Sequence, residues 1–210
     1  ELTKADFGKV KKLDFGFDRN NLTSKQLKPV AEFKNLESFR IHASRNRLDN
    51  LSFLKGLTQL EELDWSWSGF NDEQLKHLAG FKQLKSIDIG YCSLADISVL
   101  AGLKQLEDVR IDGNKDLADE QLKHLAGLEK LKTLSLCSTN LADISALGEL
   151  KQLKTISLWN TPKLTRASLS KVRKALPNCD IHVDSWWEKY WKVVLGIAIG
   201  LAAVYFFFKS

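Results

Sequence analysis

Cysteines are few in this sequence, and nothing in their spacing pairs them. The 210 residues contain three, Cys92, Cys137 and Cys179, with no CxxC motif and no Cys/His cluster. An odd and widely spaced set predicts neither a disulfide framework nor a zinc site. Such a set mildly favours a reducing compartment. Cys137 follows an apolar strand residue on the outward side and is expected to be an exposed but unreactive thiol.

Blocks of like charge are also missing. The formal net charge is +5, but three lysines and one glutamate follow Asp184, which leaves 28 basic and 25 acidic residues up to and including Asp184. Nucleic-acid-binding grooves concentrate Lys and Arg on one surface, whereas this part of the chain mixes both signs. The composition therefore does not favour nucleic acid as a partner.

Motifs for catalysis and metal binding are absent too. The sequence has no glycine-rich phosphate loop and no nucleophile motif. His77 and His124 occupy the same position of a duplicated segment, so repetition explains both. The segment 112–116 (DGNKD) lacks the glycine and the distal glutamate of a calcium loop and is expected to be a polar turn. We predict no enzyme, no metal and no cofactor.

Internal duplication is the strongest signal in the chain. The nine residues 72–80 (DEQLKHLAG) recur unchanged at 119–127, and residues 94–98 (LADIS) recur at 141–145. Both offsets are 47 residues, so the unit is a double repeat. Duplication at a fixed period is typical of repeat architectures.

A finer pattern, apolar-x-x-apolar-x-apolar, runs through both halves of the double repeat. It recurs at steps of 22 to 26 residues. Its eight occurrences are Val10/Leu13/Phe15, Leu36/Phe39/Ile41, Leu60/Leu63/Trp65, Leu84/Ile87/Ile89, Leu106/Val109/Ile111, Leu131/Leu134/Leu136, Leu153/Ile156/Leu158 and Leu176/Cys179/Ile181.

The pattern resembles that of the leucine-rich-repeat family over about residues 10–184. The resemblance implies an α/β fold, a solenoid of about eight parallel strands on a concave face, over residues 1–184. One repeat cannot bury its own apolar face, whereas stacked repeats share a continuous core. The connectors at 24–33, 74–78, 121–125 and 165–176 have helical spacing. Those at 51–57, 97–103 and 144–150 are shorter and predict 3₁₀ turns.

The short connectors open with Asp-Ile-Ser and look like those of bacterial internalin-type repeats. In the leucine-rich-repeat family an Asn or Cys usually follows each strand and binds backbone groups of the turn. The equivalent positions here carry small polar residues, which predicts a weaker ladder: Ser44, Ser68, Cys92, Asn114, Thr139 and Thr161.

Acidic and aromatic residues gather at the outward positions of the middle repeats, because strand residues alternate between core and outside. Phe17 lies at the equivalent end of the first strand. We predict a protein-binding site here for a partner of basic or mixed charge, since aromatic residues beside charge are common at interface hot spots. The alternative is that the acidic residues only keep an exposed sheet soluble. The predicted site residues are Glu62, Asp64, Trp67, Asp88, Tyr91, Asp108, Arg110, Asp112 and Trp159.

The C-terminal sixteen-residue segment 193–208 carries no charge and predicts a single transmembrane helix. At 1.5 Å per residue it spans about 24 Å, and flanking residues extend it towards the roughly 30 Å bilayer core. Residues 185–192 form a predicted juxtamembrane aromatic belt, and residues 209–210 form a tail. The predicted interface residues are Trp186, Trp187, Tyr190, Trp191 and Lys192.

Small residues on this predicted helix, Gly196, Gly200 and Ala203, would allow close helix packing, in a homodimer or against another membrane protein. The lysine bias slightly favours a cytoplasmic solenoid, whereas a signal peptide cleaved before Glu1 would place it in the periplasm or another extracytoplasmic space.

Together these features predict a membrane-anchored protein-interaction scaffold. Two alternatives use the same features: an immunity-type protein that neutralises a toxin or enzyme at the membrane, and a structural accessory subunit recruited through its helix.

Overall fold

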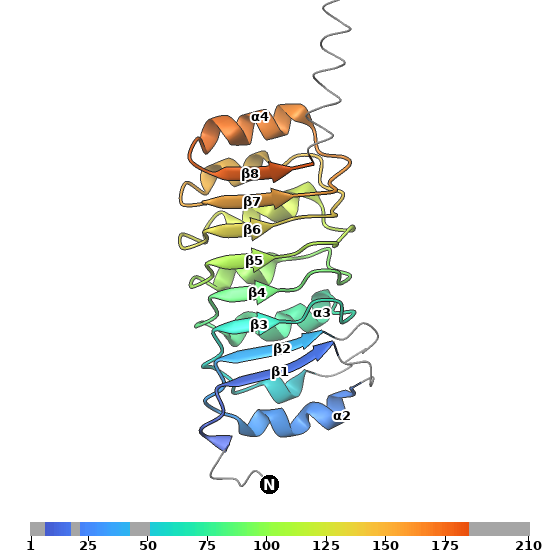
Figure 1. Ribbon diagram of the computed structural model, residues 1–210, viewed down its shortest axis with the longest axis vertical. Helices are drawn as coiled ribbons and strands as arrows, with labels where there is room; N and C mark the ends of the chain where they lie inside the picture. Colours follow the sequence, from blue (N-terminus) through green and yellow to red (C-terminus); the bar gives the residue numbers. More distant parts are fainter. Residues whose placement is uncertain (1–6, 18–21, 43–50, 185–210) are drawn as a thin grey trace, which may run out of the picture.

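The computed structural model describes residues 7–17, 22–42 and 51–184. In this part of the chain, eight strands form one parallel sheet in the order β1-β2-β3-β4-β5-β6-β7-β8, so each strand pairs with its neighbours in sequence. Figure 1 shows the strands stacked like rungs, with the connecting segments returning behind them. The predicted parallel repeat architecture is confirmed.

The strands are short, as the spacing of the apolar residues predicts. Their bounds are β1 Lys12–Phe17, β2 Ser38–His42, β3 Glu62–Asp64, β4 Ser86–Asp88, β5 Asp108–Arg110, β6 Thr133–Ser135, β7 Thr155–Leu158 and β8 Asp180–Val183. From β1 to β7 the middle apolar residue of each repeat pairs with that of the next, as in Leu63 with Ile87 and Ile87 with Val109. The register of these seven strands is therefore the register of the sequence pattern. The last pair departs from it, because Ile156 pairs with Ile181, the third apolar residue of the eighth occurrence.

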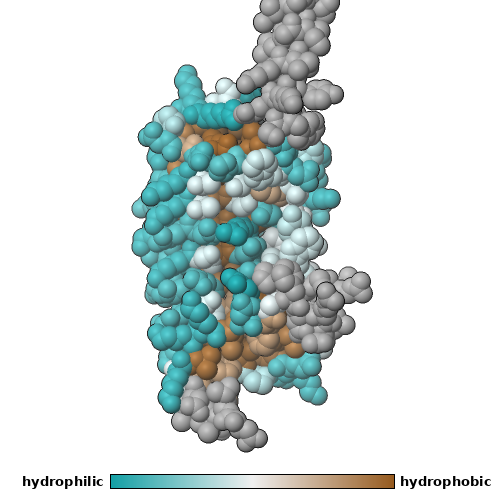
Figure 2. Space-filling model, viewed as in Figure 1, coloured by the Kyte–Doolittle hydropathy of each residue, from teal (hydrophilic) through white to brown (hydrophobic). Residues whose placement is uncertain are grey.

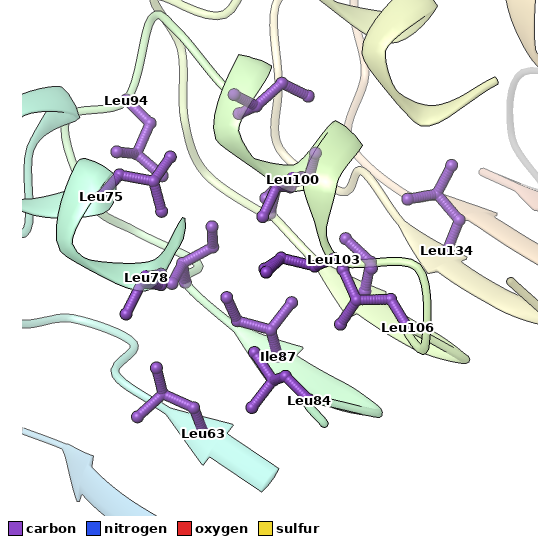
Figure 3. Close-up of a cluster of buried hydrophobic side chains, with 14 of the residues drawn as sticks. Leu63, Leu75, Leu78, Leu84, Ile87, Leu94, Leu100, Leu103, Leu106 and Leu134 are labelled. Atoms are coloured by element: carbon purple, nitrogen blue, oxygen red, sulfur yellow. The ribbon is translucent and has the colours of Figure 1, made fainter. Parts of the chain in front are cut away.

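The core is a continuous column of leucine and isoleucine side chains between the sheet and the connectors. Leu84, Ile87 and Leu106 have no exposed surface. Figure 3 shows strand residues such as Leu63 and Leu134 directed towards connector residues such as Leu100. Every inner repeat is covered on both sides by its neighbours, which is how stacked repeats bury a face that one repeat cannot.

The column is less well covered at its two ends. Phe15 occupies a core position of the first repeat but is 37% exposed, and it packs edge-on against Phe39 with ring centroids 5.9 Å apart. Cys179 precedes β8 and is only partly buried. The prediction that these two residues lie in the core is wrong for different reasons. Phe15 belongs to the first repeat, which has a described neighbour on one side only. Cys179 precedes β8, and Ile181 takes the position beside Ile156 that the pattern assigned to Cys179.

The connectors between strands are shorter in regular structure than expected. They comprise α2 Ser24–Leu27, η1 Lys28–Glu32, η2 Ser52–Leu54, α3 Asp72–Leu75, η3 Lys76–Gly80, η4 Ser98–Gly102, η5 Asp119–Leu125, η6 Ser145–Glu149 and α4 Arg166–Ala175, where η denotes a 3₁₀ helix. The 3₁₀ turns of the short connectors are confirmed. Of the predicted helical connectors, the first two contain a single α-turn followed by 3₁₀, the third is wholly 3₁₀, and the last is a ten-residue α-helix.

The two identical nine-residue segments differ because their N-caps differ. Asn71 accepts a hydrogen bond from the Gln74 N–H, and the Gln74 side chain accepts one from the Asn71 N–H, which forms a capping box. Ala118 holds the same place before the second copy and makes no side-chain cap. Gln121 instead accepts a hydrogen bond from the Ile97 N–H of the preceding repeat.

Hydrogen bonds between neighbouring connectors explain why the sequence unit is a double repeat. Asp119, at the start of a long connector, accepts the N–H groups of Ala142 and Asp143 at 2.9 and 3.0 Å. Asp72 accepts the equivalent pair, Ala95 and Asp96, at 3.0 and 3.1 Å. The acid of one long connector thus caps the short connector that follows, and the pair repeats after 47 residues.

The turn ladder predicted at the strand ends is present and buried at Ser68, Cys92, Asn114, Thr139 and Thr161. The Ser68 hydroxyl donates to the Trp65 carbonyl at 2.7 Å, and the Thr139 hydroxyl donates to Leu136 at 2.8 Å. Asn114 satisfies more backbone groups than these hydroxyls, since its amide donates to the carbonyls of Ile111 and Ile89 and its oxygen accepts from Leu94. Ser44 lies outside the described residues.

The predicted juxtamembrane, transmembrane and tail segments, residues 185–210, also lie outside the described residues. Within the described ranges, the search for a helix long and apolar enough to cross a bilayer finds none.

Candidate partner-binding site

The outward residues of the strands form one exposed surface, here called the sheet face. Pairing between β3, β4 and β5 places Glu62 beside Ser86 and Asp108, and Asp64 beside Asp88 and Arg110. A shallow depression of about 220 Å³ lies over these strands, lined in part by Arg40, Asp64, Asp88 and Arg110. The structure therefore brings six of the predicted site residues into one area, since Asp112 lies two residues after the end of β5.

Two arginines offset part of the acidic charge. Arg40 contacts Asp14 through Nη1 at 3.2 Å and Asp64 through Nε at 3.3 Å, and so bridges three neighbouring strands. Arg110 contacts Asp108 on its own strand at 3.4 Å. These ion pairs are partly exposed, so their net contribution to stability is small, about 0–1 kcal/mol.

Several aspartates of the sheet face also hold the backbone at the strand ends. Asp64 accepts hydrogen bonds from the N–H and hydroxyl of Ser66, and Asp88 accepts one from the Gly90 N–H at 3.0 Å. Asp112 accepts from the Ser135 hydroxyl and the Cys137 N–H, both at 2.6 Å. Ser66 and Gly90, which alternation places outside, are buried under these contacts.

The carboxyl group of Asp88 has a raised pKa. Burial raises the pKa of its carboxyl, and the negative charges of Asp64 and Asp112 raise it further; the Gly90 N–H and Arg110 act in the opposite direction. The Gly90 N–H and Arg110 therefore do not fully offset the cost of burying the Asp88 carboxylate in its charged form.

Trp67 and Tyr91 form a stacked aromatic pair just beyond the ends of β3 and β4. Their ring centroids lie 3.8 Å apart with an interplanar angle of 9°, and the residues are 48% and 38% exposed. Both have left-handed backbone conformations, with φ of 61° and 53°. Such angles are uncommon outside glycine and asparagine, and they are outliers for bulky residues.

The left-handed conformation belongs to one position that recurs along the solenoid. Five consecutive repeats share it: Trp67, Tyr91, Gly113, Ser138 and Asn160. The first four donate their backbone N–H to a carbonyl of the next repeat, and Asn160 donates to the carboxylate of Asp184. Sequence reasoning missed this column, although Gly113 and Asn160 are residue types that tolerate left-handed backbone.

Trp159 does not join the aromatic pair. It is 45% exposed, and its ring lies parallel to that of His182 on β8, with centroids 6.3 Å apart. It directly follows β7, four strands beyond β3, which is about 19 Å at the usual spacing of parallel strands. Trp159 is therefore a predicted site residue that lies apart from the Trp67–Tyr91 pair.

The two edges of the sheet face differ in chemistry. Ion pairs between neighbouring repeats line the edge where strands begin, as in Lys11 with Glu37, Glu61 with Lys85 and Glu107 with Lys132. Figure 2 shows this edge as strongly hydrophilic, while the opposite edge, where strands end, is paler. The exposed Trp67–Tyr91 pair lies on the second edge.

The thiols have raised pKa values. Burial raises the pKa of Cys92 to about 11, and burial also raises that of Cys137, which is half-buried rather than exposed as predicted. No group of three potential metal ligands occurs within the described residues. Segment 112–116 contains the buried Asn114 of the turn ladder.

Comparison with solved structures identifies the fold. Internalin C2 from Listeria monocytogenes is 24% identical with a TM-score of 0.67, covering 87% of this chain and 84% of its own length. The chain has the fold of a leucine-rich-repeat solenoid. An internalin F structure from the same organism is 25% identical with a TM-score of 0.67, over 87% of this chain and 58% of that one.

A third structure, the functional domain of InlJ from Listeria monocytogenes, is 20% identical with a TM-score of 0.59 and covers 88% of this chain and 38% of its own length. That domain is described as including a cysteine ladder. In the turn ladder of the present solenoid, Cys92 is the one cysteine among the five described positions. No protein-family model and no curated protein sequence matches the chain.

Proposed function

We propose that the chain is a protein-interaction scaffold that binds a protein partner through its sheet face. The observation that carries the proposal is the Trp67–Tyr91 stack, which leaves large aromatic surface exposed in an unfavourable backbone conformation. Strain of this kind clusters at functional sites in proteins. The acidic residues beside the stack favour a partner segment of basic or mixed charge.

The alternative, that acidic residues only keep the sheet soluble, accounts for Glu62 but not for the exposed aromatic pair. The internalin structures support an interaction module at the level of the fold. They do not identify a partner for this chain, so the basic or mixed charge of the partner is itself proposed.

Charge reversal with a matched control tests the scaffold proposal. The Glu62 side chain is exposed and makes no hydrogen bond or ion pair with a described residue, so Glu62→Lys should leave the fold intact. We expect Glu62→Lys together with Asp88→Lys to abolish capture of a cognate partner, identified by crosslinking and copurification in mild detergent. Asp116→Lys, at an exposed site off the strands, is the control. Undiminished capture by the double variant would contradict binding through the sheet face.

We further propose that residues 193–208 tether the scaffold to a membrane. The sixteen uncharged residues and the flanking Trp186, Trp187, Tyr190 and Trp191 support this. A variant that ends at Asp184 should move from the membrane to the soluble fraction on cell fractionation. An unchanged distribution would contradict the tether.

Two further outcomes would favour the alternatives. If Gly196→Leu with Gly200→Leu abolished copurification while sheet-face variants did not, the chain would be an accessory subunit of a membrane complex. If the captured partner were a toxin or enzyme whose activity the chain inhibits, it would be an immunity-type protein.

A further inference from the structure

The Trp67–Tyr91 stack, here called the aromatic platform, is unequally exposed. Tyr91 lies between Trp67 and the next repeat, where a Cβ at position 113 would come within 2.7 Å of Tyr91 Cε1. Gly113 therefore lets the tyrosine ring lie flat against the backbone. The platform is fixed from one side by Gly113, and Trp67 offers its larger exposed surface, 48% against 38% for Tyr91.

Two aspartates flank Gly90, the residue before Tyr91, and this position is here called the Gly90 notch. A Cβ at position 90 would lie 3.2 Å from Asp88 Oδ1, 3.3 Å from the Asp112 carbonyl oxygen and 3.5 Å from Asp112 Cβ. Asp88 and Asp112 therefore pack closely on either side of Gly90, one residue from Tyr91.

The charges around the notch do not balance. Arg40 contacts Asp14 and Asp64 and lies on β2, three strands from β5. Arg110 contacts Asp108 and offsets only part of the charge of Asp88. Asp112 is satisfied by hydrogen bonds from neutral groups, the Ser135 hydroxyl and the Cys137 N–H. The notch is therefore complementary to a cation.

We infer that the aromatic platform and the Gly90 notch together receive an arginine side chain from the protein partner. The guanidinium would lie against the exposed Trp67 ring and direct its N–H groups towards Asp88. Tryptophan is the best aromatic partner for a cation, and a planar guanidinium can stack and donate hydrogen bonds at the same time. This inference rests on the proposed function, which it refines from a basic segment to one residue type.

Other occupants of aromatic surfaces fit this one less well. A nucleic acid would bring phosphates next to Asp88 and Asp112, and like charges repel. A sugar could stack on Trp67, but it would leave the carboxylate charges without a counter-charge. An arginine can both stack on the Trp67 ring and neutralise the carboxylate charge beside it.

A randomised twelve-residue peptide library, selected on the full chain in detergent, tests the inference. Peptides retained by the unaltered chain and rejected by Trp67→Ser should be enriched in arginine at one position. Replacing that arginine by citrulline, which keeps the shape and removes the charge, should weaken binding at least tenfold.

Three variants separate the platform from the rest of the sheet face. Trp67→Ser and Asp88→Asn should each weaken the selected peptides at least tenfold; Asp88→Asn keeps an oxygen that can accept from the Gly90 N–H. Trp159→Ser, a second exposed tryptophan, should leave affinity unchanged. Binding that is insensitive to citrulline or to Trp67→Ser, or Trp67-dependent binding to a glycan array in place of peptides, would overturn the inference. If the selected peptides lacked arginine but failed to bind the Glu62→Lys, Asp88→Lys variant, the arginine inference would be overturned. The scaffold proposal would then still stand.

Discussion

Asn71 and Ala118 stand at the same position before two identical nine-residue segments, and only Asn71 caps the connector that follows it. The first copy opens as α3, whereas the second is the 3₁₀ helix η5. Ala118 already has the extended backbone of an N-cap, with φ −85° and ψ 153°, and it is exposed. One side chain outside the duplicated segment thus accounts for the difference in local structure.

Ala118→Asn should therefore stabilise the solenoid. The new side chain can accept the Gln121 N–H as Asn71 accepts that of Gln74, and an N-cap of this type contributes about 0.5–2 kcal/mol. Urea denaturation followed by circular dichroism measures the gain, with Ala118→Val as a control that offers no acceptor. A loss of stability would show that the Gln121 contact with Ile97 depends on an uncapped connector.

Asp119→Ala should destabilise the fold by about 1–3 kcal/mol, since a charged acceptor would be removed from two backbone N–H groups. Asp72→Ala should have a similar effect for the same reason. Asp116→Ala, at an exposed aspartate that caps no neighbouring connector, should change the free energy of unfolding by less than about 0.5 kcal/mol. Equal effects of Asp119→Ala and Asp116→Ala in denaturant melts would contradict a stabilising role for the hydrogen bonds between connectors.

The sequence pattern was enough to predict the strands, their register from β1 to β7 and the buried turn ladder, because these depend on apolar spacing that stacked repeats enforce. It misplaced the last strand, where Ile181 and not Cys179 pairs with Ile156. Leu63, Ile87 and Val109 could be aligned by counting. The form of the connectors could not, since it depends on a cap at Asn71 or Ala118 and on side chains from the next repeat.

The candidate site was only partly predictable. The alternation of strand residues correctly predicted that Asp64, Asp88 and Arg110 lie together. It also predicted an exposed Ser66, but Ser66 is buried and its hydroxyl donates a hydrogen bond to Asp64. The stack of Trp67 on Tyr91 depends on the left-handed backbone conformation of both residues, which the spacing of apolar residues does not predict. The distance of Trp159 from that stack follows from counting strands.

Trp67→Asn should change stability little, although it removes a large aromatic side chain. Asparagine tolerates left-handed backbone, so relief of strain offsets the lost stacking, each about 1 kcal/mol. Trp65→Ala, at a buried position two residues away, should instead cost about 3–5 kcal/mol. Guanidinium denaturation compares the two. A similar large loss for both would mean that the aromatic platform is structural.

Asp88→Asn should raise the melting temperature at neutral pH, because it removes a half-buried charge and keeps an acceptor for the Gly90 N–H. The pKa of Asp88 is raised in the folded state, so folding is favoured as pH falls through that pKa towards the ordinary value of 3.8. The advantage of the variant should therefore shrink between pH 7 and pH 4 in thermal melts. Carboxyls with lowered pKa, such as Asp96 and Asp143, lose their contributions only below that range. An advantage that grows on acidification would contradict the assignment.

Removal of residues 72–118 should leave a shorter solenoid that still folds cooperatively. The deletion joins Asn71 to Asp119, so the capped connector sequence is restored and β3 meets β6 in the register that β3 now has with β4. The variant should be less stable than the full chain, because stability in stacked repeats grows with the number of interfaces. Removal of residues 72–107 instead joins Asn71 directly to β5 without a connector. We expect this second deletion to lose its cooperative unfolding transition, and a cooperative transition there would show that the 47-residue unit is not the folding module.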